Sequence, residues 1–156
     1  MKHIIIFFLK PLSFLPALAM MYVIYGFSAQ DAGASSNLSY QVSYKIVEIG
    51  NEILDKGLDE TQIADYADQI GYPVRKLAHM TEYFLLAVAV SFPFYVYGLR
   101  GFPLMLVAGF ICVAFAAGDE YHQSFVAGRG PSVKDVGIDS IGAFFGIMTV
   151  QIICWV

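Results

Sequence analysis

Four long apolar stretches alternate with polar segments along the chain. They cover about Leu12–Phe27, which extends backwards through Ile4–Leu9, then Leu77–Tyr97, Phe102–Ala117 and Val136–Val156. A helix needs about 20 apolar residues, range roughly 17–25, to cross a bilayer core. Lipid cannot hydrogen-bond exposed backbone groups, so such stretches form helices. The pattern predicts an all-α, polytopic membrane helical bundle with about four transmembrane helices, as one domain over residues 1–156.

Prolines and short connections refine this bundle. Pro16 and Pro93 lie inside spans, where proline produces a local kink. Residues 97–101 form a short connection between the second and third spans, which makes these two spans antiparallel neighbours. Pro103 suits the first turn of the third helix, where its missing N–H leaves no bond unmade.

The polar segment between the first two spans predicts two short amphipathic helices. Residues 31–37 are small and polar, which favours a loop. Apolar residues then recur at helical spacing until Gly57, a plausible stop. A second helix begins with Asp59 as N-cap and Gln62 in a capping box, and Gly71 and Pro73 are expected to end it. The apolar positions of the two helices are Val42, Ile46, Ile49 and Ile53, then Ile63, Tyr66, Ala67 and Ile70.

These amphipathic helices have two interpretations. They pack over the end of the bundle or lie on lipid headgroups, or else they bind a partner protein. Residues 1–24 contain lysines and apolar residues, as a signal peptide does, but lack a small-x-small cleavage site before a polar domain. We therefore expect a retained first span.

Composition agrees with a membrane protein. Apolar residues make up 58% of the chain and charged residues 14%, against roughly 25% charged residues in soluble domains. The net charge of −4 argues against nucleic acid as a partner, because phosphates require a basic patch. Cys112 and Cys154 lie in apolar runs, so we expect buried thiols and no disulfide. No closed set of metal ligands is present, and no cofactor is expected.

Orientation follows from the basic residues of the two sides. Lys2, Lys10 and Arg100 lie on one side, and Lys45, Lys56, Arg75, Lys76, Arg129 and Lys134 on the other. The positive-inside rule places the second set in the cytoplasm. However, four of these six residues flank the polar residues described next, so they can be required at these positions by function rather than by orientation. Without these four, the number of basic residues on the two sides does not decide the orientation.

Ionisable residues gather at the span ends on one side of this topology. Arg75, His79 and Glu82 share one helical face at the start of the second span, with Lys76 beside them. Asp119, Glu120, His122 and Gln123 end the third span, and Ser28, Gln30 and Asp31 follow the first. Charges at membrane depth are costly and usually face the bundle interior. We therefore expect a common polar mouth.

The fourth span completes this mouth. Ser132 is the expected N-cap, and Asp135 lies in the first turn, where the helix dipole favours an anion. Asp139 lies one turn deeper. Gly142 and Gly146 continue the same face in Gly-x-x-x-Gly spacing, which allows another helix to approach closely.

Three interpretations of the mouth remain open. The first is a structural network in which arginines pair with carboxylates. The second is a site for an anionic headgroup or other polar ligand, held by Arg129, Lys76 and the N-terminus of the fourth helix. The third is catalysis, with His79 or His122 as general base, or a metal held by His and carboxylates. His3 is terminal and has no expected role.

These residues resemble the VanZ-like family of bacterial envelope proteins. The matching fragments are Phe27-Ser28-Ala29-Gln30, Arg75-Lys76-Leu77-Ala78-His79, Glu82-Tyr83, Asp119-Glu120, Gln123, Phe125, Gly128-Arg129, Asp135, Asp139 and Gly142. Ala29 stands where the family commonly has a second serine, so no hydroxyl role is carried over there. The resemblance implies a multi-pass protein of the bacterial inner membrane. The family is named for a protein that gives low-level teicoplanin resistance, and an envelope role implies that the mouth faces outward.

The leading hypothesis is a membrane-embedded site for an anionic envelope lipid or a cell-wall-linked ligand. The first alternative is an intramembrane hydrolase or transferase that acts on a lipid. The second is a structural module that binds a partner protein through residues 39–70. Candidate catalytic residues are His79, Glu82, Asp119 and His122, and candidate ligand-binding residues are Arg75, Lys76, Glu120, Gln123, Arg129, Asp135, Asp139, Ser28 and Gln30.

Overall fold

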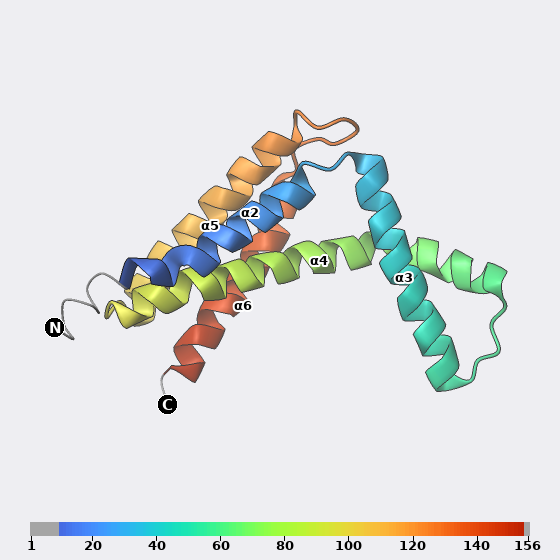
Figure 1. Cartoon of the computed structure of the whole chain (residues 1–156), viewed down its shortest axis with the longest axis horizontal. Coiled ribbons are helices and arrows are strands. Elements are labelled where there is room, and N and C mark those ends of the chain that lie inside the picture. The colour runs from blue at the N-terminus through green and yellow to red at the C-terminus, as the bar shows by residue number, and fades with distance from the viewer. Residues whose placement is uncertain (1–9, 155–156) are drawn as a thin grey trace.

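Five α-helices and one short 3₁₀ helix make up the part of the chain that the computed structural model describes, residues 10–154 (Figure 1). No strand occurs among these residues. The predicted extension over residues 4–9, His3 and the last two residues of the fourth span lie outside them. The elements are η1 (Lys10–Phe14), α2 (Leu15–Ser28), α3 (Ala32–Leu54), α4 (Glu60–Val96), α5 (Gly101–Gln123) and α6 (Val133–Ile153).

Four helical segments are long and apolar enough to cross a membrane, which confirms the predicted all-α bundle. They are Pro11–Ser28, Glu60–Val96, Gly101–Gln123 and Val133–Ile153. Figure 1 shows α2, α5, α6 and the later part of α4 running together, while α3 and the start of α4 project to one side. Large apolar side chains such as Phe110 and Leu18 are exposed on the outside of the bundle. An apolar exterior of this kind suits contact with lipid.

The core lies around α4, which packs against α2, α5, α6 and, near its start, α3. Tyr83 and Leu86 from α4 are fully buried with Leu104 and Cys112 from α5 and the nearly buried Ile147 from α6. Residues 97–100 connect α4 to α5, and α5 returns alongside α4 (Figure 1). The predicted antiparallel pair is therefore confirmed.

The prediction that Gly71 and Pro73 end a helix is wrong. A single helix, α4, runs from Glu60 to Val96 and joins the predicted second amphipathic helix to the second span. Proline inside a helix costs about 3 kcal/mol. Here α3 packs along this part of α4, and Ile63 and Ala67 are buried in the contact. Tertiary packing outweighs the local helix breaker.

The predicted loop at residues 31–37 is also helical. Asp31 is the N-cap of α3, and its side chain accepts a hydrogen bond from the Ala34 amide at 2.8 Å. The helix runs for 23 residues and ends at Leu54, before the expected stop at Gly57. The capping box at Asp59 and Gln62 is confirmed.

Two further details of the helices differ from the expectation. Pro16 lies inside the first candidate span, as predicted, but it occupies the first turn of α2, directly after η1, where proline breaks no helical hydrogen bond and no kink is required. On α3, the apolar stripe with Ile46, Ile49 and Ile53 is exposed, while Ser39 and Ser43 are buried. The small serine face packs on α4, because small side chains allow close helix contact. The stripe does not pack over the bundle.

Helices α4 and α6 run parallel and touch at the two predicted glycines. A Cβ added to Gly142 would lie 2.1 Å from the carbonyl oxygen of Met80, and one added to Gly146 would lie 2.3 Å from that of Phe84. At the far end, the Tyr95 hydroxyl donates to the Cys154 carbonyl at 2.6 Å. Only glycine permits this backbone approach.

We expect Gly142→Ala to lower the free energy of unfolding by about 1–3 kcal/mol, because even one methyl group forces the two backbones apart. The measurement is equilibrium unfolding of the purified protein in detergent, titrated with a denaturing detergent. Gly118→Ala is the matched control, since a Cβ there meets nothing within 4 Å and alanine favours helix over glycine. Equal stability of the two variants would contradict this account of the contact.

Candidate functional site

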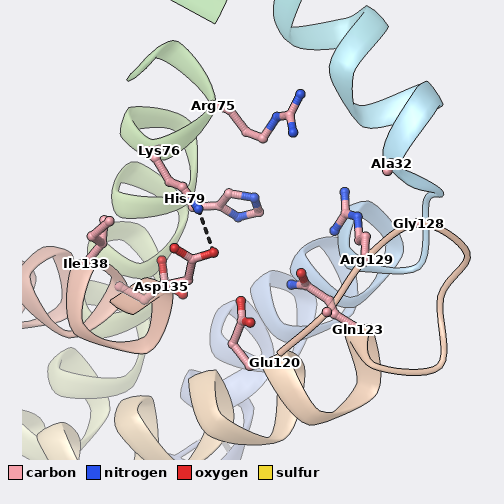
Figure 2. A pocket seen from close by; sticks show the side chains of 12 residues that line it. Ala32, Arg75, Lys76, His79, Glu120, Gln123, Gly128, Arg129, Asp135 and Ile138 are labelled. Atoms are coloured by element: carbon pink, nitrogen blue, oxygen red, sulfur yellow. Dashed lines mark ion pairs between the residues drawn. The ribbon is translucent and has the colours of Figure 1, made fainter. Parts of the chain in front are cut away.

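A polar pocket lies at one end of the bundle. Helices α2 and α5 end there, α6 begins there, and the middle of α4 passes beside it. Its volume is about 150 Å³, enough for several water molecules. Figure 2 shows charged side chains from α4, α5, α6 and the loop before α6 pointing into it. The lining residues are Ala32, Arg75, Lys76, His79, Glu120, Gln123, Gly128, Arg129, Gly130, Asp135, Ile138 and Asp139.

Eight of the thirteen candidate residues line this pocket, and they come from α4, the end of α5, the loop before α6 and the start of α6. Segments far apart in the chain supply them, so no local pattern could have shown the distances between them. Lys76 Nζ lies 2.5 Å from Asp135 Oδ2, and both side chains are about one-fifth to one-quarter exposed. This ion pair joins α4 to α6 at the pocket wall.

A second polar pair lies along α4. The Nδ1 atom of His79 is 3.3 Å from Oε2 of Glu82, and both side chains are about one-fifth exposed. The carboxylate lies beside the imidazole, and His79 lines the pocket. The arrangement of a carboxylate behind an imidazole is one that general bases use.

The end of α5 is tied to the start of α6. The backbone amide of Ser132 donates to Oε2 of Glu120 at 2.7 Å, and the Ser132 hydroxyl accepts from the Asp135 amide, which confirms the predicted N-cap. Gln123 donates to Asp119 at 3.1 Å. A carboxylate of the protein thus already lies at the start of α6, the place where the sequence suggested a ligand anion.

The two arginines at the pocket, Arg75 and Arg129, donate hydrogen bonds to neutral oxygen atoms, unlike Lys76, which pairs with a carboxylate. Arg75 donates to the hydroxyls of Ser36 at 2.6 Å and Ser39 at 3.2 Å, both on α3. Arg129 donates to the Ser28 carbonyl at 3.3 Å. Within residues 10–154 neither guanidinium makes an ion pair with a carboxylate. Figure 2 shows both groups turned toward the same space beside His79.

The pKa of Arg129 reflects this setting. Burial lowers its pKa from the ordinary value of an arginine and the positive charge of Arg75 lowers it further, while the carboxylates of Asp119, Glu120 and Asp31 oppose this shift in part. Arginine stays charged despite such shifts. Two positive charges thus lie within electrostatic range of each other.

The loop that carries Arg129 is held in place by α3. Gly128 adopts a positive φ of 73°, and a Cβ there would lie 3.0 Å from the Cβ of Ala32. The Ala32 amide donates to the Ala127 carbonyl at 3.2 Å. These contacts position Arg129 over the pocket.

Five predicted site residues do not line this pocket. His122 stacks on Tyr25 of α2, with ring centroids 4.5 Å apart. Asp119 is buried beneath the pocket, within electrostatic range of His79 and His122. Ser28 contributes its carbonyl oxygen to Arg129. Gln30 and Glu82 line a neighbouring groove that contains Leu38 and Val42.

Sequence reasoning missed several polar residues. Ser36 and Ser39 hold Arg75, but they lie in a stretch interpreted partly as loop. Tyr83 is fully buried among the carboxylates of Glu82, Asp119, Glu120 and Asp139. Serines at spacings of four, Ser35, Ser39 and Ser43, were a signal of a buried polar helix face.

Seven buried side-chain atoms have no hydrogen-bond partner among the described residues. They include the Tyr83 hydroxyl oxygen, Oδ1 of Asp119 and Oδ1 of Asp139, a residue that is only 4% exposed. Such atoms are rare and call for water or a ligand. The described residues contain no group of three His, Cys, Asp or Glu side chains placed to hold a metal.

Comparison with known families agrees with this geometry. The family model described as VanZ/LLP1 matches residues 13–154, nearly the whole chain. The chain belongs to the VanZ/LLP1 family. No curated protein and no solved structure matches it. The matched VanZ/LLP1 region contains all four candidate spans from residue 13 onward and every residue of the pocket.

For this VanZ/LLP1 protein we expect the Lys76–Asp135 pair to contribute to the α4–α6 contact. Removing either charge leaves the other half-buried and unpaired, which costs about 1–3 kcal/mol. A double-mutant cycle of Lys76→Met and Asp135→Asn, read by unfolding in detergent, should show coupling.

The control cycle uses Lys45 and Glu48 on α3, whose pair at 2.5 Å is largely exposed. Exposed pairs contribute little, so no measurable coupling is expected there. A coupling energy between Lys76 and Asp135 that is no larger than that of the control pair would show that this ion pair does not stabilise the fold.

Proposed function

We propose that this protein binds an anionic envelope lipid, or another cell-wall-linked ligand, at the polar pocket of its bundle. The single observation that carries the proposal is the pair of guanidiniums, Arg75 and Arg129, which turn toward one space and form no ion pair with a carboxylate of residues 10–154. A phosphate placed between them would accept charge-assisted hydrogen bonds from both and offset their repulsion. Arginine forks match phosphate and carboxylate geometry well.

The other charges of the pocket support this assignment by contrast. Lys76 is paired with Asp135, Glu120 accepts the Ser132 amide, and His79 lies against Glu82. A purely structural network would pair the arginines as well, because unpaired charges at membrane depth are costly. Within the described part of the chain the hydrogen-bond partners of Arg75 and Arg129 are neutral, so these two groups are the ones available to an anion.

The lower part of the pocket adds a second requirement for the ligand. Oδ1 of Asp139 lacks a donor among the described residues. A headgroup with hydroxyl or ammonium donors beside its phosphate would complement both parts of the site. Envelope lipids and lipid-linked cell-wall intermediates carry such headgroups.

The proposal includes the cellular setting that the family implies. We place the protein in the bacterial inner membrane, with the pocket facing outward. There, binding of a cell-wall intermediate would contribute to glycopeptide (teicoplanin) resistance. A strain that expresses Arg129→Gln at normal levels would then have the teicoplanin sensitivity of a strain without the protein.

We expect Arg129→Gln to weaken the binding of phosphatidylglycerol about tenfold or more, since a hydrogen bond to a charged group contributes about 1.5–3 kcal/mol. Native mass spectrometry of the detergent-purified protein measures the bound fraction against phosphatidylcholine as competitor. Arg75→Gln should have a similar effect.

The matched control is Arg100→Gln, which removes the same charge at the opposite end of the bundle, where Arg100 stacks on Tyr95 at 4.8 Å. This variant should bind phosphatidylglycerol as the unaltered protein does. Unchanged binding in a folded Arg129→Gln variant, or equal losses in Arg129→Gln and Arg100→Gln, would remove the proposal.

A second candidate function is acid–base catalysis on the bound lipid. The observation that favours it is the His79–Glu82 pair at 3.3 Å, with His79 at the pocket wall. A base must lie within hydrogen-bond reach of the proton that it removes. In this candidate His79 is the base and Glu82 positions its ring.

If this candidate holds, incubation of the protein with envelope lipids yields a new product that mass spectrometry detects. His79→Gln should reduce its rate by about 100-fold or more, while phosphatidylglycerol binding stays within a few-fold of normal. Lipids that are recovered unchanged after incubation with the active protein would exclude this candidate and leave the binding proposal intact.

A further inference from the structure

An apolar groove of about 220 Å³ lies directly beside the polar pocket. Its walls come from α3 and α4, and the end of α2 closes one side. The apolar lining residues are Phe27, Leu38, Val42, Val74 and Ala78. A groove of this composition accommodates hydrocarbon and excludes well-hydrated groups.

The groove and the pocket are joined at the charged residues. Arg75, His79 and Arg129 line both. A molecule that reaches from one to the other therefore passes the two guanidiniums. Two of the polar side chains that line the groove, Glu82 and His79, lie against each other, with Oε2 of Glu82 3.3 Å from Nδ1 of His79.

The groove also lies at the depth where the apolar part of α4 begins. Val74, Ala78 and Glu82 are spaced four apart on one face of α4, and the apolar stretch of this helix starts near Leu77. On the other wall, Leu38 is 45% and Val42 is 46% exposed. In water two such residues on an apolar stripe would be unfavourable, whereas lipid covers them at no cost.

We propose that the groove holds the hydrocarbon chain of the same molecule whose phosphate lies between Arg75 and Arg129. The ligand is thus a phosphate-bearing membrane amphiphile that reaches the pocket sideways from the bilayer between α3 and α4. This inference rests on the proposed function, and it adds the chain, the groove and the direction of access. A water-soluble phosphate or sugar phosphate would use the pocket alone.

The test compares matched probes on the full-length protein in detergent by calorimetry. The probes are dihexanoyl- and dioctanoyl-phosphatidylglycerol and the deacylated headgroup glycerophosphoglycerol. Affinity should rise with chain length, because each buried methylene adds favourable transfer free energy. Val42→Trp fills the groove and should weaken dioctanoyl-phosphatidylglycerol about tenfold while glycerophosphoglycerol binding stays unchanged.

Ile49→Trp is the control, because Ile49 lies two turns further along the same exposed stripe of α3 and outside the groove. Equal effects of the two substitutions, or equal affinity for acylated and deacylated probes, would overturn the groove assignment. In those cases a loss of binding in Arg129→Gln still upholds the pocket. If Arg129→Gln changes no probe's affinity, the proposed function itself fails.

A measurement on the unaltered protein covers the case in which Val42→Trp does not fold. A phosphatidylglycerol with a photoreactive diazirine in its acyl chain should label residues 38–42 of α3 and 74–78 of α4. Excess phosphatidylglycerol should compete this labelling away, and excess phosphatidylcholine should not. Labelling spread over the lipid-facing surfaces of all helices, or insensitive to phosphatidylglycerol, would contradict a specific groove.

Discussion

Helix α6 lies so close to α4 that Gly142 and Gly146 leave no room for a side chain between them. Helix packing in lipid has no hydrophobic driving force, so close van der Waals contact and polar bonds must supply it. The Lys76–Asp135 pair and the Tyr95–Cys154 hydrogen bond fix the two ends of this contact. The register places Asp135 and Asp139 opposite the charged face of α4. The pocket exists because this contact is tight.

Some charged groups at the mouth are bonded within the protein, whereas Oδ1 of Asp119 and Oδ1 of Asp139 have no hydrogen-bond partner among the described residues. Glu120 accepts a backbone amide at the start of α6, and Gln123 donates to Asp119. Arg75 and Arg129 instead have hydroxyl and carbonyl partners on α3 and α2. A low-dielectric setting strengthens the repulsion between two such cations. An anion between them removes that repulsion, which is the physical basis of the binding proposal.

Helix α3 lies beside the site, and its orientation differs from the one expected for an amphipathic helix that packs over the bundle. Its serine face lies on α4 and its apolar stripe faces away from the bundle. An arrangement with the polar face inward is unusual for a protein in water, but it suits a helix beside lipid. It also places Leu38 and Val42 opposite Val74 and Ala78, where they form the apolar groove next to the two arginines.

By itself the sequence determined the features that depend on neighbours within a few residues or on overall hydrophobicity. These are the apolar spans, the caps at Asp59 and Ser132, the glycine face of α6 and the gathering of charges at one mouth. Tertiary structure alone decided the continuation of α4 through Pro73, the stacking of His122 on Tyr25, and the partners of Arg75 and Arg129. Those outcomes depend on contacts between distant segments. At these positions the free energy of packing exceeds the local conformational preference of the residues, and the spacing of residues along the chain does not encode which distant segments will pack together.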